Sequence, residues 1–209
     1  MNLPHAAGAA LAGLTYIFVV KTIDTLWHGI FAPPLLTTVV VALNILAGLA
    51  QLIFYIQLFR QMTSPDGPAL RFGAWLGILG SILSLLPKLL ALAVLHQKPI
   101  FFFYLRQGAH LAAFGPWLAA VLLFICCAIF FFNIGPGREP DLRRAFGAGA
   151  TGYGVMALVL SVVLVNHLSG VRIAWSAGQT GLSQLIFLST ALFTYLAVAY
   201  FYTRFMPRR

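Results

Sequence analysis

The fold class is decided by one apolar stretch in the middle of the chain, residues 109–132, which reads AHLAAFGPWLAAVLLFICCAIFFF. The stretch contains no acidic residue, no lysine and no arginine. A helix needs roughly 20 predominantly apolar residues to cross the hydrocarbon core of a bilayer. Because this stretch is long enough, it predicts a membrane-spanning helix.

The composition of the whole chain extends this prediction. Of its 209 residues, 61% are hydrophobic and only 8% are charged. Soluble domains are about half apolar and about a quarter charged, so these few charges could not cover the apolar surface in water. A soluble globular domain, a disordered chain, a coiled coil and a disulfide-stapled secreted module are therefore excluded. We predict an integral, multi-pass membrane protein, expected in a bacterial-type inner membrane.

The predicted fold is all-α, with residues 1–209 forming a single bundle of six transmembrane helices. Proline and glycine interrupt the apolar runs at Pro33-Pro34, at 63–68 and at 135–140. The expected spans are about 6–22, 35–59, 72–95, 109–132, 147–165 and 182–205. Residues 99–104 are aromatic but too short to cross, so we expect them to lie along the membrane surface or to dip into it.

The basic residues predict the orientation of the bundle. One side receives eight of them, and the other side receives four: Arg60, Arg71, Arg138, Arg143, Arg144, Arg204, Arg208 and Arg209 against Lys21, Lys98, Arg106 and Arg172. Positive residues collect on the cytoplasmic side, so both termini are expected in the cytoplasm. The net charge of +9 then favours anionic lipid headgroups at that face, and nucleic acid is not an expected partner.

Polar residues inside the predicted spans fall on helical stripes. Asn44, Gly48, Gln51 and Tyr55 share one face of the second span, and Ser84 and Lys88 share one face of the third. Such faces should point into the bundle, because polar groups are costly in lipid. Two interpretations stay open: a network of interhelical hydrogen bonds, or a path for a solute.

Lys88 is the one basic residue deep inside a predicted span, directly after Pro87. An intramembrane lysine is a candidate functional residue, although its side chain could also extend to the outer headgroups. Its best candidate partner is Asp24, because the other three acids map to the cytoplasmic side and Asp24 alone lies near the outer side. Asp24 could equally form an ion pair with Lys21 at the end of its own helix.

Four histidines map to the outer ends of the spans and, with Asp24, form a candidate outer-face cluster: His28, His96, His110 and His167. Imidazole and carboxylate groups suit zinc, copper or iron, and two histidines could hold haem. A quinone headgroup could also bind there. Histidine is equally an ordinary residue of the membrane interface, and no metal-binding spacing is present.

No catalytic motif and no acid inside a span is present. The expected function is therefore a non-catalytic subunit or binding component of a larger membrane assembly, joined by other subunits or by self-association. Small-residue pairs such as Gly73–Gly77 supply faces for helix contacts. Two alternatives remain: a channel or transporter for an anionic or polar solute, and an electron-transfer protein that binds metal, haem or quinone.

Overall fold

The computed structural model describes residues 2–26, 34–62, 67–95, 99–134, 140–169 and 181–207. These residues form six α-helices: α1 Leu3–Leu26, α2 Pro34–Met62, α3 Pro68–Leu95, α4 Pro99–Asn133, α5 Pro140–Ser169 and α6 Gly181–Thr203. The all-helical fold predicted from the composition is confirmed.

The beginnings of the helices follow from local chemistry. Pro34, Pro68, Pro99 and Pro140 are each the first residue of a helix, where the fixed φ of proline fits and its missing N–H is not needed. At the start of α1, the side-chain oxygen of Asn2 accepts a hydrogen bond from the backbone N–H of His5 at 3.3 Å, which is an N-cap. The polar and proline-containing breaks in the sequence therefore become the helix boundaries.

Five helices contain segments that are long and apolar enough to cross a membrane: Leu3–Ile23, Thr37–Gln61, Pro68–Leu90, Phe114–Asn133 and Pro140–Val165. The apolar segment of α6 is shorter, Leu188–Thr203. Large apolar side chains are exposed on all six helices, among them Val19, Leu46, Leu79, Phe124, Leu158 and Leu196. An outer surface of this kind suits lipid and would be unstable in water.

The helix α4 begins before its predicted span. The aromatic segment at residues 99–104 is the first part of α4 and continues without a break into the span. The helix has 35 residues and is about 52 Å long at 1.5 Å per residue, whereas the hydrocarbon core is about 30 Å thick. The segment of α4 that is long and apolar enough to cross a membrane is Phe114–Asn133, so the placement of residues 99–104 at the membrane surface stays a prediction.

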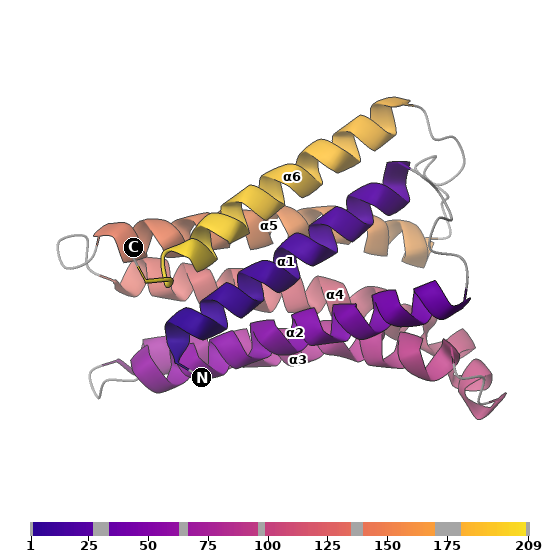
Figure 1. The fold of residues 1–209 in the computed structure, drawn as a ribbon, viewed down its shortest axis with the longest axis horizontal. Helices are drawn as coiled ribbons and strands as arrows, with labels where there is room; N and C mark the ends of the chain where they lie inside the picture. The colour runs from indigo at the N-terminus through magenta and orange to yellow at the C-terminus, as the bar shows by residue number, and fades with distance from the viewer. Residues whose placement is uncertain are drawn as a thin grey trace.

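The six helices form a closed ring in chain order. Each helix packs against its neighbours in sequence, and α1 packs against α6 to close the ring (Figure 1). Within the residues that the structure describes, no other pair of helices brings its backbones together. Both ends of the described chain lie at the same end of the bundle, hereafter the terminal end.

Large aromatic side chains fill the ring near the terminal end. Phe54, Phe146, Phe201 and Phe205 stack edge to face or tilted, with ring centroids 5.2–5.7 Å apart. The buried residues of α1 all lie in its first turns, and those of α6 all lie near its end. Toward the opposite end α6, α1 and α2 spread apart (Figure 1). The packed core therefore sits in the terminal half.

Small residues make the close contacts between helices, as the sequence suggested. A Cβ atom on Gly13 of α1 would lie 2.8 Å from the Cα of Ala47 on α2. One on Gly152 of α5 would lie 2.7 Å from Val198 of α6, and one on Gly80 of α3 would lie 3.1 Å from the carbonyl oxygen of Ala119 on α4. Larger side chains at these positions would push neighbouring helices apart.

Candidate functional site

Lys88 lies where α3 passes α2. A Cβ atom on Gly48 would lie 3.1 Å from Lys88 Nζ, so the ammonium group lies over a position on α2 that has no side chain. Lys88 is half-buried. In the described part of the chain it makes no ion pair and no hydrogen bond. The structure therefore places an ammonium group against the stripe of α2 that begins at Asn44.

Lys21 of α1 is the second ammonium group in this region. Its side chain is exposed, whereas that of Lys88 is half-buried. Both α1 and α3 pack against α2. The two lysines therefore come from the two helices that flank α2.

The other three residues of the predicted polar path differ in the contacts that they make. Asn44 is half-buried one turn before Gly48. Gln51 makes an interhelical bond, donating from Nε2 to the hydroxyl of Tyr153 on α5 at 3.4 Å. Ser84 donates at 2.8 Å to the carbonyl oxygen of Ser81 on its own helix, so its hydroxyl links no neighbouring helix.

A cluster of tyrosines lies directly below this region, toward the terminal end. The hydroxyls of Tyr153 on α5 and Tyr202 on α6 are 3.1 Å apart and buried. Tyr55 of α2 is fully buried beside them, and its hydroxyl has no hydrogen-bond partner in the described residues. Tyr55 shares the stripe of Gln51, but nothing in the sequence connects Tyr153 and Tyr202, because their meeting depends on the order of helices in the ring.

The candidate outer-face cluster is not tested by the described side chains. Asp24, His110 and His167 belong to helices α1, α4 and α5, but the placement of their side chains lies outside the described set. His28 and His96 lie outside the described residues altogether. Among the side chains that are described, no group of three or more histidine, cysteine, aspartate or glutamate residues could hold a metal ion. The metal or haem site therefore stays a prediction.

The terminal end carries several ordered basic residues. Asp141, in the first turn of α5, lies 3.8 Å from Arg204 and 4.0 Å from Arg144. Arg143 donates to the carbonyl oxygen of Phe131 at 3.3 Å and lies over its ring. The arrangement ties the end of α6 to the start of α5. Most of the described arginines therefore lie at the terminal end, away from Lys21 and Lys88.

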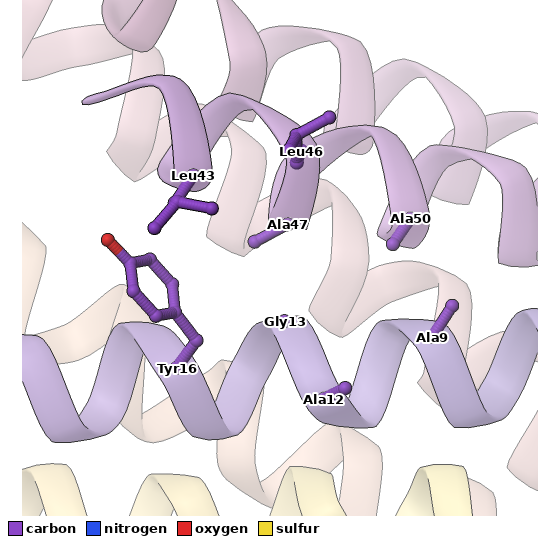
Figure 2. A pocket seen from close by; sticks show the side chains of 8 residues that line it. All are labelled: Ala9, Ala12, Gly13, Tyr16, Leu43, Leu46, Ala47 and Ala50. Atoms are coloured by element: carbon purple, nitrogen blue, oxygen red, sulfur yellow. The ribbon is translucent and has the colours of Figure 1, made fainter. Parts of the chain in front are cut away.

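A groove runs along the outer surface between α1 and α2 (Figure 2). It has a volume of about 290 Å³ and is lined by Ala9, Ala12, Gly13, Tyr16, Leu43, Leu46, Ala47 and Ala50. Tyr16 and Leu43 close one end, and the small side chains of Ala9 and Ala50 flank the other. The groove exists because small residues draw α1 and α2 together along this face.

Chemically, the described residues offer hydrogen-bond donors, phenol hydroxyls and the half-buried ammonium group of Lys88 between the helices, and apolar surface outside the ring. Cys126 and Cys127 are free and buried in the helix contacts, as expected of small apolar side chains. This inventory suits binding and packing. Comparison of the chain with protein-family models, with curated proteins and with solved structures finds no match.

Proposed function

We propose that this protein is a non-catalytic binding component of a larger membrane assembly, with a transmembrane helix of another subunit seated in the α1–α2 groove. The observation that carries the proposal is the lining of the groove, where five of eight residues are alanine or glycine. Small residues let helix backbones approach closely, and close packing is what drives helix association in lipid.

The rim of the groove fits the same partner. Leu43 and Leu46 are 39% and 59% exposed beside the small residues, so an incoming helix would meet large side chains at the edge and small ones at the bottom. Ridges packing into grooves is the ordinary geometry of helix contacts. In the proposed setting the protein spans a bacterial-type inner membrane six times, with its arginine-rich terminal end among anionic headgroups of the cytoplasmic face.

The proposal is tested by a substitution that fills the groove and leaves the helix ring intact. Ala12 lines the groove and is exposed, so Ala12→Trp should block a docked helix while leaving α1 and α2 in contact. Ala42 of α2 is equally exposed but does not line the groove, so Ala42→Trp is the matched control. The mass of the assembly is measured after mild extraction from the native membrane.

We expect the wild type and the Ala42→Trp protein to run as an assembly larger than the single chain, and the Ala12→Trp protein to lose the partner. A wild-type protein that is monomeric and partner-free, and that moves a solute by itself, would contradict the proposal. If the extracted assemblies of the two variants had equal masses, we would conclude that lipid chains, and not a helix of another subunit, occupy the groove.

A second candidate function, passage of an anionic or polar solute, is favoured by the polar groups inside the ring. Lys88, Gln51 and Tyr153 follow one another from the spread end toward the core. Lys88→Met should then reduce anion flux in reconstituted vesicles. Unchanged flux would remove Lys88 from this function.

A further inference from the structure

We propose that a groove between α4 and α5, near the terminal end, binds one anionic phospholipid, with an acyl chain along the groove and the phosphodiester on Arg143. This site lies on a different pair of helices from the α1–α2 groove of the proposed function, and each can exist without the other. Its occupant is also of another class, a lipid in place of a helix.

The groove combines a wall of aromatic rings with a floor of small residues. It has a volume of about 390 Å³ and is lined by Phe124, Ala128, Phe131, Phe132, Gly147, Ala150 and Thr151. The hydroxyl of Thr151 donates at 2.9 Å to the carbonyl oxygen of Gly147 on its own helix. The one side-chain polar group of the lining is therefore already hydrogen-bonded, and the groove offers a chain an apolar surface.

The groove runs along α4 and reaches its terminal end. The lining residues of this helix extend from Phe124 to Phe132, one residue before α4 ends at Asn133. Eight residues of helix correspond to about 12 Å at 1.5 Å per residue. An extended chain that enters from the headgroup level could therefore lie in the groove over this length.

The aromatic wall favours an acyl chain over a helix. Three of the seven lining residues are phenylalanines, and Phe132 is 77% exposed. Helix backbones approach closely over small residues, whereas exposed rings at the edge hold a helix about 10 Å wide off the floor. A flexible chain fits between the rings, and it supplies the van der Waals contacts that the lining atoms of an empty groove would lack.

Arg143 stands at the headgroup end of the groove. It precedes Gly147 by one turn and shares the face of α5 that carries Ala150 and Thr151. Its guanidinium carbon lies 4.7 Å from the centre of the Phe131 ring, and its Nε–H donates at 3.3 Å to the carbonyl oxygen of Phe131. Because the Phe131 ring itself lines the groove, these two contacts hold the guanidinium group at the end of the groove.

The guanidinium group of Arg143 still has donors for a phosphate. Nε uses one of its five N–H donors, and the other four make no hydrogen bond to any residue that the structure describes. Parallel guanidinium N–H groups match the oxygens of a phosphate. The described ion pairs nearby join two arginines, Arg144 and Arg204, to the single carboxylate of Asp141. This excess of positive charge favours an anionic headgroup over a zwitterionic one.

The test uses the full-length protein, delipidated in a non-ionic detergent. Three probes are added separately: phosphatidylglycerol, phosphatidylcholine with the same acyl chains, and inorganic phosphate. Native mass spectrometry over a series of probe concentrations counts the bound molecules and gives an apparent affinity. The same spectra give the mass of any assembly of protein chains.

Two pairs of variants address the two parts of the site. Arg143→Gln removes the charge, and Arg60→Gln is its matched control, because Arg60 is exposed on α2, which packs against neither α4 nor α5 in the described chain. Thr151→Trp fills the groove from an exposed position. Ala42→Trp adds the same ring at an exposed position on α2 that does not line the groove.

We expect the wild type to retain one phosphatidylglycerol more tightly than phosphatidylcholine, and to retain no inorganic phosphate. Arg143→Gln should weaken the retention of phosphatidylglycerol about tenfold to a hundredfold, the effect of losing hydrogen bonds to a charged group. Thr151→Trp should weaken it too, because the ring takes the place of the chain. Arg60→Gln and Ala42→Trp should bind as the wild type does.

Two milder variants separate loss of the site from loss of the fold. Arg143→Lys keeps the charge but not the planar fork of donors, so it should bind more tightly than Arg143→Gln and less tightly than the wild type. Thr151→Ala removes the hydroxyl and leaves the groove open, so it should bind as the wild type does.

Four results would overturn the site: equal affinity of the wild type for the two lipids, retention of inorganic phosphate as strong as that of lipid, equal losses in Arg143→Gln and Arg60→Gln, or unchanged lipid binding by Thr151→Trp. A lower assembly mass for Thr151→Trp with unchanged lipid binding would mean that a helix of another subunit occupies this groove.

Discussion

At the scale of single residues, glycine positions decide how closely the helices approach. A Cβ atom on Gly77 of α3 would lie 2.9 Å from Tyr55 Cε1 and 3.0 Å from Cys126 Sγ. The same atom on Gly115 of α4 would meet nothing closer than the carbonyl oxygen of Leu83, at 3.8 Å. Two glycines inside membrane helices are therefore expected to respond oppositely to the same substitution.

Gly77→Ala should lower the free energy of unfolding by about 1–3 kcal/mol, because the added methyl group overpacks the contact with Tyr55 and Cys126. Gly115→Ala should leave stability unchanged or raise it by up to about 1 kcal/mol, because alanine is the better helix former. Unfolding of the purified protein in detergent, followed by circular dichroism, measures both. Equal losses in the two variants would mean that helix packing at Gly77 is looser than the structure shows.

At the scale of elements, the contact between α1 and α6 is what makes the ring closed. Thr15 of α1 and Tyr195 of α6 join their hydroxyls at 3.2 Å, and Phe18 stacks on the Tyr195 ring with centroids 4.5 Å apart. Both contacts lie near the middle of α1 and α6. The side chain of Tyr195 therefore contributes two contacts to the closure of the ring.

Tyr195→Phe should cost about 0.5–1.5 kcal/mol, since it removes one hydrogen bond and keeps the stacked ring. Tyr195→Ala should cost more and should loosen the seam between α1 and α6. A cysteine placed at the buried position Ala10 reports the loosening by its rate of maleimide labelling, because Cys126 and Cys127 are themselves buried. Labelling that is equally slow in Tyr195→Ala would show that other contacts hold the ring closed.

At the scale of the whole molecule, the even number of helices brings both ends of the described chain to one end of the bundle. The connections between α2 and α3 and between α4 and α5 must then share that end, and the other three connections must share the opposite one. The arginines of the terminal end predict that it faces the cytoplasm.

Single cysteines in the connections test this orientation. Ser64→Cys, between α2 and α3, should react with a membrane-impermeant maleimide only after the membrane is opened. Gln97→Cys, between α3 and α4, should react in intact cells or right-side-out vesicles. The opposite pattern would place the arginine-rich end outside and would reverse the assignment of Lys21 and Lys88 to the outer half.

The sequence by itself determined the class of protein and the faces of its helices. Hydrophobic runs bounded by proline and glycine are local, so the six helices and their approximate limits could be predicted. The stripe of Asn44, Gly48 and Gln51 could be predicted too, because helical periodicity depends only on spacing. The same local rules did not show that residues 99–104 are helical and continuous with the helix of the following span.

Only the tertiary structure decided which faces meet. The placement of Lys88 over Gly48 and the meeting of Tyr153 with Tyr202 depend on helices ordered in a closed ring, and no local pattern encodes that order. In lipid the hydrophobic effect does not choose helix partners, so close packing of small residues and a few polar contacts choose them. The division of the basic residues between the two sides could be predicted from the sequence, whereas the contact of Lys88 with α2 depends on the packed ring.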